Sequence, residues 1–158
     1  MTATAPDLSV GAPMPTITLP SGMPAAVGTV YERDTVTYTD RDVHTNKFET
    51  RRDTILTIQG HCRIWVEGEF RTGQRTQILL APGAELELWV GGGVSINQGT
   101  EINVNTGDPS RVTIFNYGTD PVVIAQDNSV YANVYSPNAH MELHQNDHFY
   151  GGFAGAGL

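Results

Sequence analysis

The sequence predicts an all-β fold, a single-stranded parallel β-helix (β-solenoid) of about four to five coils, which we expect to be right-handed. The first observation is an internal repeat, because residues 122–139 superimpose without a gap on residues 141–158. The second is that short runs of alternating apolar and polar residues are separated by glycine and asparagine, a pattern typical of strands joined by turns. A solenoid coil buries its inward side chains only against the neighbouring coils, so one copy of such a repeat does not fold alone.

Three faces per coil can be followed through the middle of the chain. The first face reads ILTI (55–58), ILLA (78–81) and INVN (102–105). The second reads CRIWV (62–66), LELWV (86–90) and RVTIF (111–115), and the third reads EFRT (69–72), VSIN (94–97) and VVIA (122–125). Glycines lie between these runs, at corners where a positive φ is expected. Near the C-terminus we expect the first two faces to merge into single strands, SVYANVY and HFYGGFA.

Alternation assigns the side chains to the inside or the outside of the coil. Two inward columns are predicted, namely Ile64, Leu88 and Ile114, and Ile78, Ile102 and Val130. Three aromatic residues then share an outward position on successive coils: Trp65, Trp89 and Phe115. Such a ladder is either covered by an N-terminal arm of the chain, or is an exposed apolar stripe that binds a partner or a glycan.

The N-terminal segment has a different composition from the rest of the chain. Residues 1–28 hold five of the nine prolines and show no amphipathic period. We expect an extended arm over 1–28, ordered by packing on the solenoid wall or on a neighbouring subunit, and the solenoid domain over 29–158.

Composition excludes several classes of function. A formal charge of −8 argues against a surface for nucleic acid or anionic membranes. No apolar run approaches the length of a membrane span, so membrane insertion is not expected. The single cysteine, Cys62, allows no internal disulfide, and its place in a strand predicts an inert thiol.

Several segments in this order resemble an uncharacterised bacterial β-helix domain. They are Trp89–Gly93, Asn97–Gly99, Pro109–Tyr117, Val134–Ala139 and Tyr150–Phe153, within a similarity that covers roughly residues 46–157. That domain occurs in cell-surface proteins, including PilX-type pilus-associated ones, and bactofilin is a more distant architectural parallel. The resemblance implies a solenoid fold, a location outside the cell or on its surface, and no defined catalytic residues. The apolar N-terminal helix of pilin-type members has no counterpart here.

The segment HMELHQNDH contains the densest group of possible metal ligands. His140, Glu142 and His144 alternate along one predicted strand and would all face outward. Alternate residues of a strand lie roughly 6.8 Å apart, so adjacent members could share a metal, whereas the two histidines could hardly reach the same ion. The spacing fits no closed zinc pattern. We therefore expect a solvated polar face and no cofactor, with a weak divalent-metal site as the alternative.

Two further groups of polar residues suggest different roles. Asp127 and Asp147 would lie about one coil apart, as the carboxylates of a carbohydrate-active β-helix enzyme must, but acidic corners are also ordinary in solenoids. Side-chain amides at successive coils could form stacked ladders that stabilise the fold: Gln98, Gln126, Gln145, Asn128 and Asn146.

The sequence thus favours a non-catalytic structural module of a cell-surface or extracellular assembly, and no motif of an enzyme is found. A solenoid without a cap exposes the backbone groups of its terminal coil, and we expect Leu158 to lie at such an edge. Homo-oligomers or filaments, formed through the solenoid ends or the arm, are the predicted assembly. The alternative is a carbohydrate-binding or carbohydrate-active β-helix protein.

Overall fold

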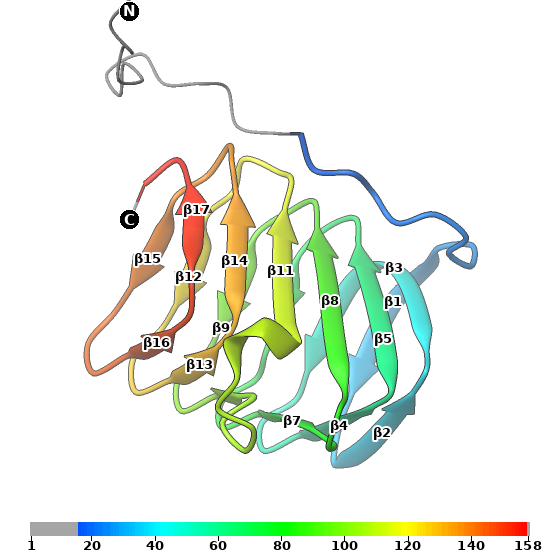
Figure 1. Ribbon diagram of the computed structural model, residues 1–158, viewed down its shortest axis with the longest axis horizontal. Helices are drawn as coiled ribbons and strands as arrows, with labels where there is room; N and C mark the ends of the chain where they lie inside the picture. Colours follow the sequence, from blue (N-terminus) through cyan, green and yellow to red (C-terminus); the bar gives the residue numbers. More distant parts are fainter. Residues whose placement is uncertain (1–15, 158) are drawn as a thin grey trace, which may run out of the picture.

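The computed structural model describes residues 16–157, and this part of the chain forms a parallel β-solenoid of about six turns (Figure 1). Every recorded strand pairing is parallel. Apart from the strands, residues 16–157 contain one short 3-10 helix, Pro109–Arg111. Within the described residues, no helix is both long and apolar enough to cross a membrane.

The strands form three walls, which we number in the order in which each turn uses them. Wall 1 contains β2 (Thr35–Thr39), β4 (Ile55–Gln59), β7 (Gln77–Leu80), β10 (Glu101–Ile102), β13 (Ser129–Tyr131) and β16 (His148–Tyr150). Wall 2 contains the first half of β3 (Asp42–Thr50), β5 (His61–Val66), β8 (Glu85–Val90), β11 (Val112–Asn116), β14 (Asn133–Ser136) and β17 (Phe153–Gly155). Wall 3 contains β1 (Val27–Glu32), the second half of β3, β6 (Phe70–Arg71), β9 (Val94–Ile96), β12 (Val122–Ile124) and β15 (Met141–Leu143).

The predicted fold class and the three faces are confirmed, but the predicted number of coils is too low. Wall 1 has six strands, one for each turn. The first turn was missed because the long strand β3 continues around a corner: its residues 42–45 pair with β5 and its residues 48–49 with β6.

The prediction that the first two faces merge into single strands near the C-terminus is also wrong. SVYANVY divides into β13 and β14 at the buried Ala132, and HFYGGFA divides into β16 and β17 at Gly151 and Gly152. Gly151 has a φ of 140°, and its backbone passes so close to the Ala132 carbonyl that a Cβ would lie 1.9 Å from that oxygen. These turns are tight enough to have been read as continuous strands.

The core consists of apolar columns that run along the solenoid axis. The two predicted inward columns are in register, since Ile64, Leu88 and Ile114 are direct neighbours on wall 2 and Ile78, Ile102 and Val130 on wall 1. On wall 3 the corresponding column is Phe48, Phe70, Val94, Val122 and Met141. All of these side chains are buried, so each turn depends on its neighbours for the apolar contacts that stabilise it.

A column of buried polar side chains occupies the corner between walls 3 and 1. Its members are Thr54, Thr76, Thr100 and Asn128, all without solvent exposure. The Thr76 hydroxyl bonds to the Thr50 hydroxyl at 2.8 Å, and Asn128 Oδ1 accepts the Thr100 N–H at 2.6 Å. This column satisfies backbone and side-chain groups that the corner removes from water.

The amide ladder predicted from Gln98, Gln126, Gln145, Asn128 and Asn146 is therefore present only in part. Asn128 belongs to the buried threonine column. On the surface, the amides of Gln98 and Asn146 both donate to the carboxylate of Asp127, at 3.2 and 3.1 Å. A carboxylate between two amides, rather than a continuous amide stack, joins these turns.

Glycine occurs at the corners of the solenoid for two separate reasons. Gly60, Gly83, Gly99 and Gly107 have the positive φ that was predicted. Gly68, Gly73, Gly91 and Gly118 do not, but a Cβ on any of them would lie within 2.6 Å of the backbone of the adjacent turn. Stacked turns approach one another too closely for a side chain at these positions.

Candidate functional site

The outer face of wall 2 carries an aromatic ladder under the N-terminal arm. Trp65, Trp89 and Phe115 are direct neighbours on successive strands, as predicted, and the rings of Trp89 and Phe115 stack with centroids 5.1 Å apart. The ladder begins one turn earlier than the sequence suggested, because His44 stacks on Trp65 at 3.9 Å. The indole N–H of Trp65 donates to the Tyr117 hydroxyl at 3.0 Å.

The arm lies across this ladder and is attached by backbone carbonyls. The Trp89 indole N–H donates to the Thr18 carbonyl at 3.1 Å, and Trp89 is only 6% exposed. His44 Nδ1 donates to the Pro24 carbonyl at 2.8 Å. Of the two alternatives predicted for the aromatic ladder, these contacts support a ladder that is covered by the arm. In Figure 1 this segment runs along the outside of the solenoid.

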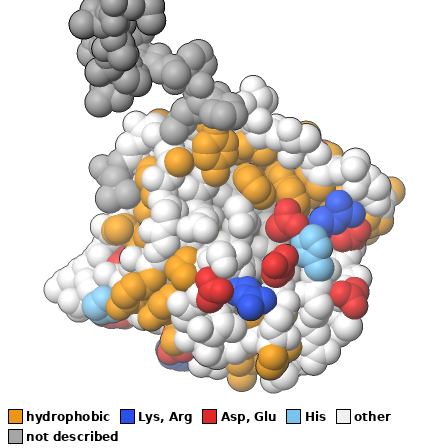
Figure 2. Space-filling model, in the orientation of Figure 1, with side chains coloured by type: hydrophobic (Ala, Val, Ile, Leu, Met, Phe, Trp, Pro, Cys, Tyr) orange, Lys and Arg blue, Asp and Glu red, His pale blue; other side chains and the backbone are white. Residues whose placement is uncertain are grey.

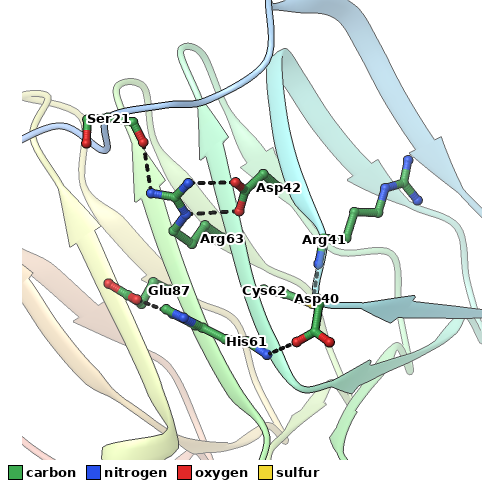
Figure 3. A network of polar contacts seen from close by, with 8 residues as sticks. All are labelled: Ser21, Asp40, Arg41, Asp42, His61, Cys62, Arg63 and Glu87. Carbon is green, nitrogen blue, oxygen red and sulfur yellow. Dashed lines mark hydrogen bonds and ion pairs between the residues drawn. The ribbon is translucent and has the colours of Figure 1, made fainter.

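Charged side chains form a second ladder on wall 2, beside the aromatic one (Figure 3). Arg63 bonds both carboxylate oxygens of Asp42, at 2.9 and 2.6 Å, and donates to the Ser21 carbonyl of the arm at 3.0 Å. These hydrogen bonds and the positive charge hold the pKa of Asp42 below its ordinary value. On the next turn, Glu87 pairs with the imidazole of His61. Figure 2 shows this mixed acidic and basic cluster on the surface.

Sequence reasoning missed this charged ladder. Asp42 and Arg63, and Arg63 and Glu87, are paired only through the register of β3, β5 and β8. A search for opposite charges at equivalent positions of the second face would have found the pair of Arg63 and Glu87. The start of the ladder at Asp42 could not be found, because the first turn was not recognised.

Cys62 is buried at the start of β5, and its pKa is raised by that burial. Its Sγ accepts a weak hydrogen bond from the Arg41 N–H at 3.5 Å. A buried thiol with a raised pKa carries little thiolate, so the structure places no activated nucleophile at this position.

The structure brings the proposed metal ligands together around one carboxylate. His140 Nε2 lies 2.8 Å from Glu142 Oε1, and His144 Nε2 lies 3.9 Å from the other oxygen, Oε2. The hydrogen bond from His140 lowers the pKa of Glu142. Over residues 16–157, no group of three or more histidine, cysteine or acidic side chains has an arrangement that could hold a metal ion. The weak metal site stays a prediction, and the hydrogen bond between His140 and Glu142 accounts for the close approach of these two side chains.

Asp127 and Asp147 perform different structural tasks. Asp147 accepts the Asn128 N–H at 2.9 Å and the His144 N–H at 2.8 Å, one bond to the turn below and one within its own turn. Asp127 has a φ of 62° at its corner, and its carboxylate joins the amides described above. Catalysis by this pair stays a prediction, while their hydrogen bonds explain why acidic residues occur there.

The ends of the solenoid are the places where its regular pairing stops. Within the described residues, β15, β16 and β17 pair with a strand on one side only, as do β1 and β2 at the other end. Four of the five partly buried apolar residues that pack on the core belong to these terminal strands: Val30 and Val36 at one end, and Phe149 and Phe153 at the other. On the last turn, Leu143 is 40% exposed and Tyr150 is 45% exposed. Leu158, predicted to lie at this edge, is outside the described residues.

Comparison with known families gives one match. A family model described as "Domain of unknown function (DUF7305)" matches residues 21–158, from the described arm to the last turn. No curated protein matches the chain. No solved structure matches it. The resemblance to PilX-type proteins and to bactofilin therefore stays a prediction from the sequence.

Proposed function

The chain belongs to the DUF7305 family, and from the ends of its solenoid we propose that it is a non-catalytic structural module that self-associates head to tail. The observation that carries this proposal is that, among the residues the structure describes, each end has strand edges that pair with no further strand and apolar side chains that are incompletely buried. Unpaired N–H and C=O groups of an edge strand accept a further strand, and such an addition needs no new fold.

The two ends are complementary because they present the walls in the same order. The last turn offers β15, β16 and β17 on walls 3, 1 and 2, and the first offers β1, β2 and the start of β3 on the same walls. A second copy placed on the last turn would set β1 on β15, β2 on β16 and β3 on β17, all in parallel. The solenoid would then continue from one subunit into the next.

The apolar columns would also continue across such a junction. Phe149 ends the inward column of wall 1, and Val36 begins it. Phe153 ends the column of wall 2, and Val43 begins it. Joining the ends removes from water the remaining exposed parts of these side chains, which favours association. The contact uses different surfaces on the two partners and stacks each copy on the next along the solenoid axis, so it yields open filaments.

The net charge opposes this association at low ionic strength. Each copy carries a formal charge of −8, and like charges on approaching copies repel over a distance of about 10 Å in 0.1 M salt. Added salt screens that repulsion but does not weaken apolar contacts. We therefore expect the oligomers to grow in size as the salt concentration rises.

Sedimentation velocity across a roughly thousand-fold range of concentration tests the proposal. The parent protein should form larger species as concentration increases. Leu143→Lys places a charge in the proposed junction, and should weaken association at least about 100-fold. Gln126→Lys adds the same charge at an exposed corner one turn inside the last turn, where the Gln126 carbonyl already accepts the Gly99 N–H at 3.3 Å, and should behave like the parent.

A protein that stays monomeric over the whole range at both low and high salt contradicts the proposal. Equal effects of Leu143→Lys and Gln126→Lys would contradict the assignment of the junction to the solenoid ends. The location outside the cell or on its surface is part of the same proposal and is supported by the sequence resemblance. Protection or cleavage of the protein when intact cells are treated with protease tests that location.

A further inference from the structure

A polar groove follows the corner at which wall 3 turns into wall 1, across the first turns of the solenoid. It has a volume of about 550 Å³ and is lined by Tyr31, Glu49, Thr50, Arg51, Arg52, Arg71, Thr72, Gly73, Gln74 and Asn97. These residues come from four successive rungs of the corner, from β1 to the end of β9. Because rungs are spaced by about 4.8 Å, the groove runs parallel to the solenoid axis over roughly 14 Å. We call it the arginine groove.

The floor of the arginine groove is open because its residues turn inward or have no side chain. Thr50 and Thr72 are buried, and the Thr50 hydroxyl accepts the Gly73 N–H at 3.0 Å. A Cβ on Gly73 would lie 2.4 Å from the Arg51 carbonyl carbon, so only glycine fits between the two turns. The groove is therefore a consequence of how the turns stack, and does not depend on the position of a flexible loop.

Its walls carry positive charge in a chain that is negative as a whole. Three arginines line the groove, against the single carboxylate of Glu49, which Lys47 pairs with at 2.9 Å. One of the three, Arg71, lies 3.6 Å from the carboxylate of Glu69. Within the described residues, neither Arg51 nor Arg52 has a carboxylate at ion-pair distance. The neighbouring Asp53 is engaged by Arg75, at 2.8 and 3.1 Å.

One aromatic ring lies at the N-terminal end of the arginine groove. Tyr31 is 49% exposed, and the guanidinium carbon of Arg51 lies 5.2 Å from the centre of its ring. This contact holds the guanidinium beside the groove without using its charge in an ion pair. The ring offers an apolar surface of the size of a sugar ring, and the exposed side-chain amide of Gln74 offers hydrogen-bond partners for hydroxyl groups.

We propose that the arginine groove binds a linear acidic polysaccharide, with its anionic groups on the arginines and a sugar ring against Tyr31. Guanidinium groups form strong paired hydrogen bonds with carboxylate and sulfate oxygens. A linear polymer suits a groove that repeats its cationic groups from rung to rung. A protein partner suits it less well, since the arginine groove has no buried apolar centre of the kind found in protein interfaces. Single-stranded nucleic acid suits it less well too, since successive bases stack on several aromatic side chains and Tyr31 is the single aromatic residue that lines the groove.

Binding can be measured by calorimetry at low salt with polygalacturonate, which carries carboxylates, with dextran sulfate, and with neutral dextran. We expect an acidic polymer to bind and neutral dextran not to bind, and binding to weaken as salt is added. The comparison of polygalacturonate with dextran sulfate identifies the anionic group that is recognised. Arg52→Gln removes a guanidinium that makes no ion pair within residues 16–157, and should weaken binding about tenfold without unfolding the protein.

Arg111→Gln is the matched control, because Arg111 lies outside the groove and pairs with Asp108 at 3.4 Å. It should bind like the parent protein. Tyr31→Ala should weaken binding of the polysaccharide. Poly-glutamate, a polyanion without sugar rings, should bind weakly to both the parent protein and this variant. Failure of both acidic polysaccharides to bind overturns the proposal. So does equal affinity of the Arg52→Gln and Arg111→Gln variants, or binding of poly-glutamate as tight as that of the polysaccharide.

Discussion

Replacement of Asn128 by leucine should destabilise the solenoid more than any exposed substitution nearby. Asn128 has no solvent exposure, and three hydrogen bonds use its side chain. Its Oδ1 accepts the Thr100 N–H at 2.6 Å, and its Nδ2 donates to the carbonyls of Ala125 at 2.7 Å and Ile96 at 3.3 Å. Leucine has a similar volume but can make none of these bonds.

The expected magnitude follows from the groups that lose their partners. Each buried polar group left without a hydrogen bond costs about 1–3 kcal/mol, and the Thr100 N–H and the Ala125 carbonyl are the two with short bonds. The apolar side chain of leucine gains about 1.5 kcal/mol from burial, which offsets part of this loss. We expect a net loss of about 3 kcal/mol in the free energy of unfolding, or a decrease of about 6–12 °C in Tm.

Urea and thermal unfolding measure this loss, with Gln126→Leu as the control. Gln126 is exposed two residues earlier in the same turn, and its replacement should change stability by less than about 0.5 kcal/mol. Turns of a solenoid can also open separately, so amide exchange of Thr100 should accelerate in Asn128→Leu before global unfolding. An Asn128→Leu protein within about 1 kcal/mol of the parent would refute the assignment of stabilising energy to the buried polar column.

Two further predictions concern close stacking of the turns and the charged ladder. Gly118→Ala should destabilise the protein by about 3 kcal/mol in urea unfolding, because the Cβ of the alanine would lie 1.9 Å from the carbonyl oxygen of Gly91. Gly28→Ala is the control for the same assay. Gly28 has no positive φ and a Cβ there would have no atom within 4 Å, so this variant should be neutral or slightly stabilised. Because its pKa is lowered in the folded state, Asp42 contributes stability that is present above about pH 4 and is lost as the pH falls through its folded pKa. Arg63→Gln removes the main cause of this pKa shift. The difference in the free energy of unfolding between the parent and this variant should therefore become smaller as the pH is lowered. A difference that does not change with pH would contradict the reasoning.

The repeating part of the fold could be predicted from the sequence because it depends on alternation. The columns through Ile64 and Ile78 were assigned to the correct side and the correct register, since shifting a strand by one residue moves every side chain to the opposite face. The first turn was not found, because β3 continues around its corner near Asn46 as one uninterrupted strand, and no glycine marks that corner. Alternation gives no information about where an uninterrupted strand bends.

The buried polar column was missed for another reason. Threonine is common in strands, so Thr54, Thr76 and Thr100 gave no signal that distinguishes a buried corner from an exposed face. The arginine groove was missed as well, since its residues come from several rungs and its opening depends on the backbone contact at Gly73. Contacts between turns of unequal length become visible only when the register of every pair of turns is known.

The unequal length of the turns has a consequence for folding itself. Equivalent positions of the buried column are separated by 28 residues between Thr100 and Asn128, but by 19 between Asn128 and Asp147. In a solenoid of identical repeats, a turn that skips its neighbour and pairs with the following one loses few contacts, and misaligned forms compete with the native one. Here a skipped turn would place loops of the wrong length at the corners and break the hydrogen bonds of that column. Irregularity of the repeat thus directs each turn to one neighbour and disfavours misaligned folding.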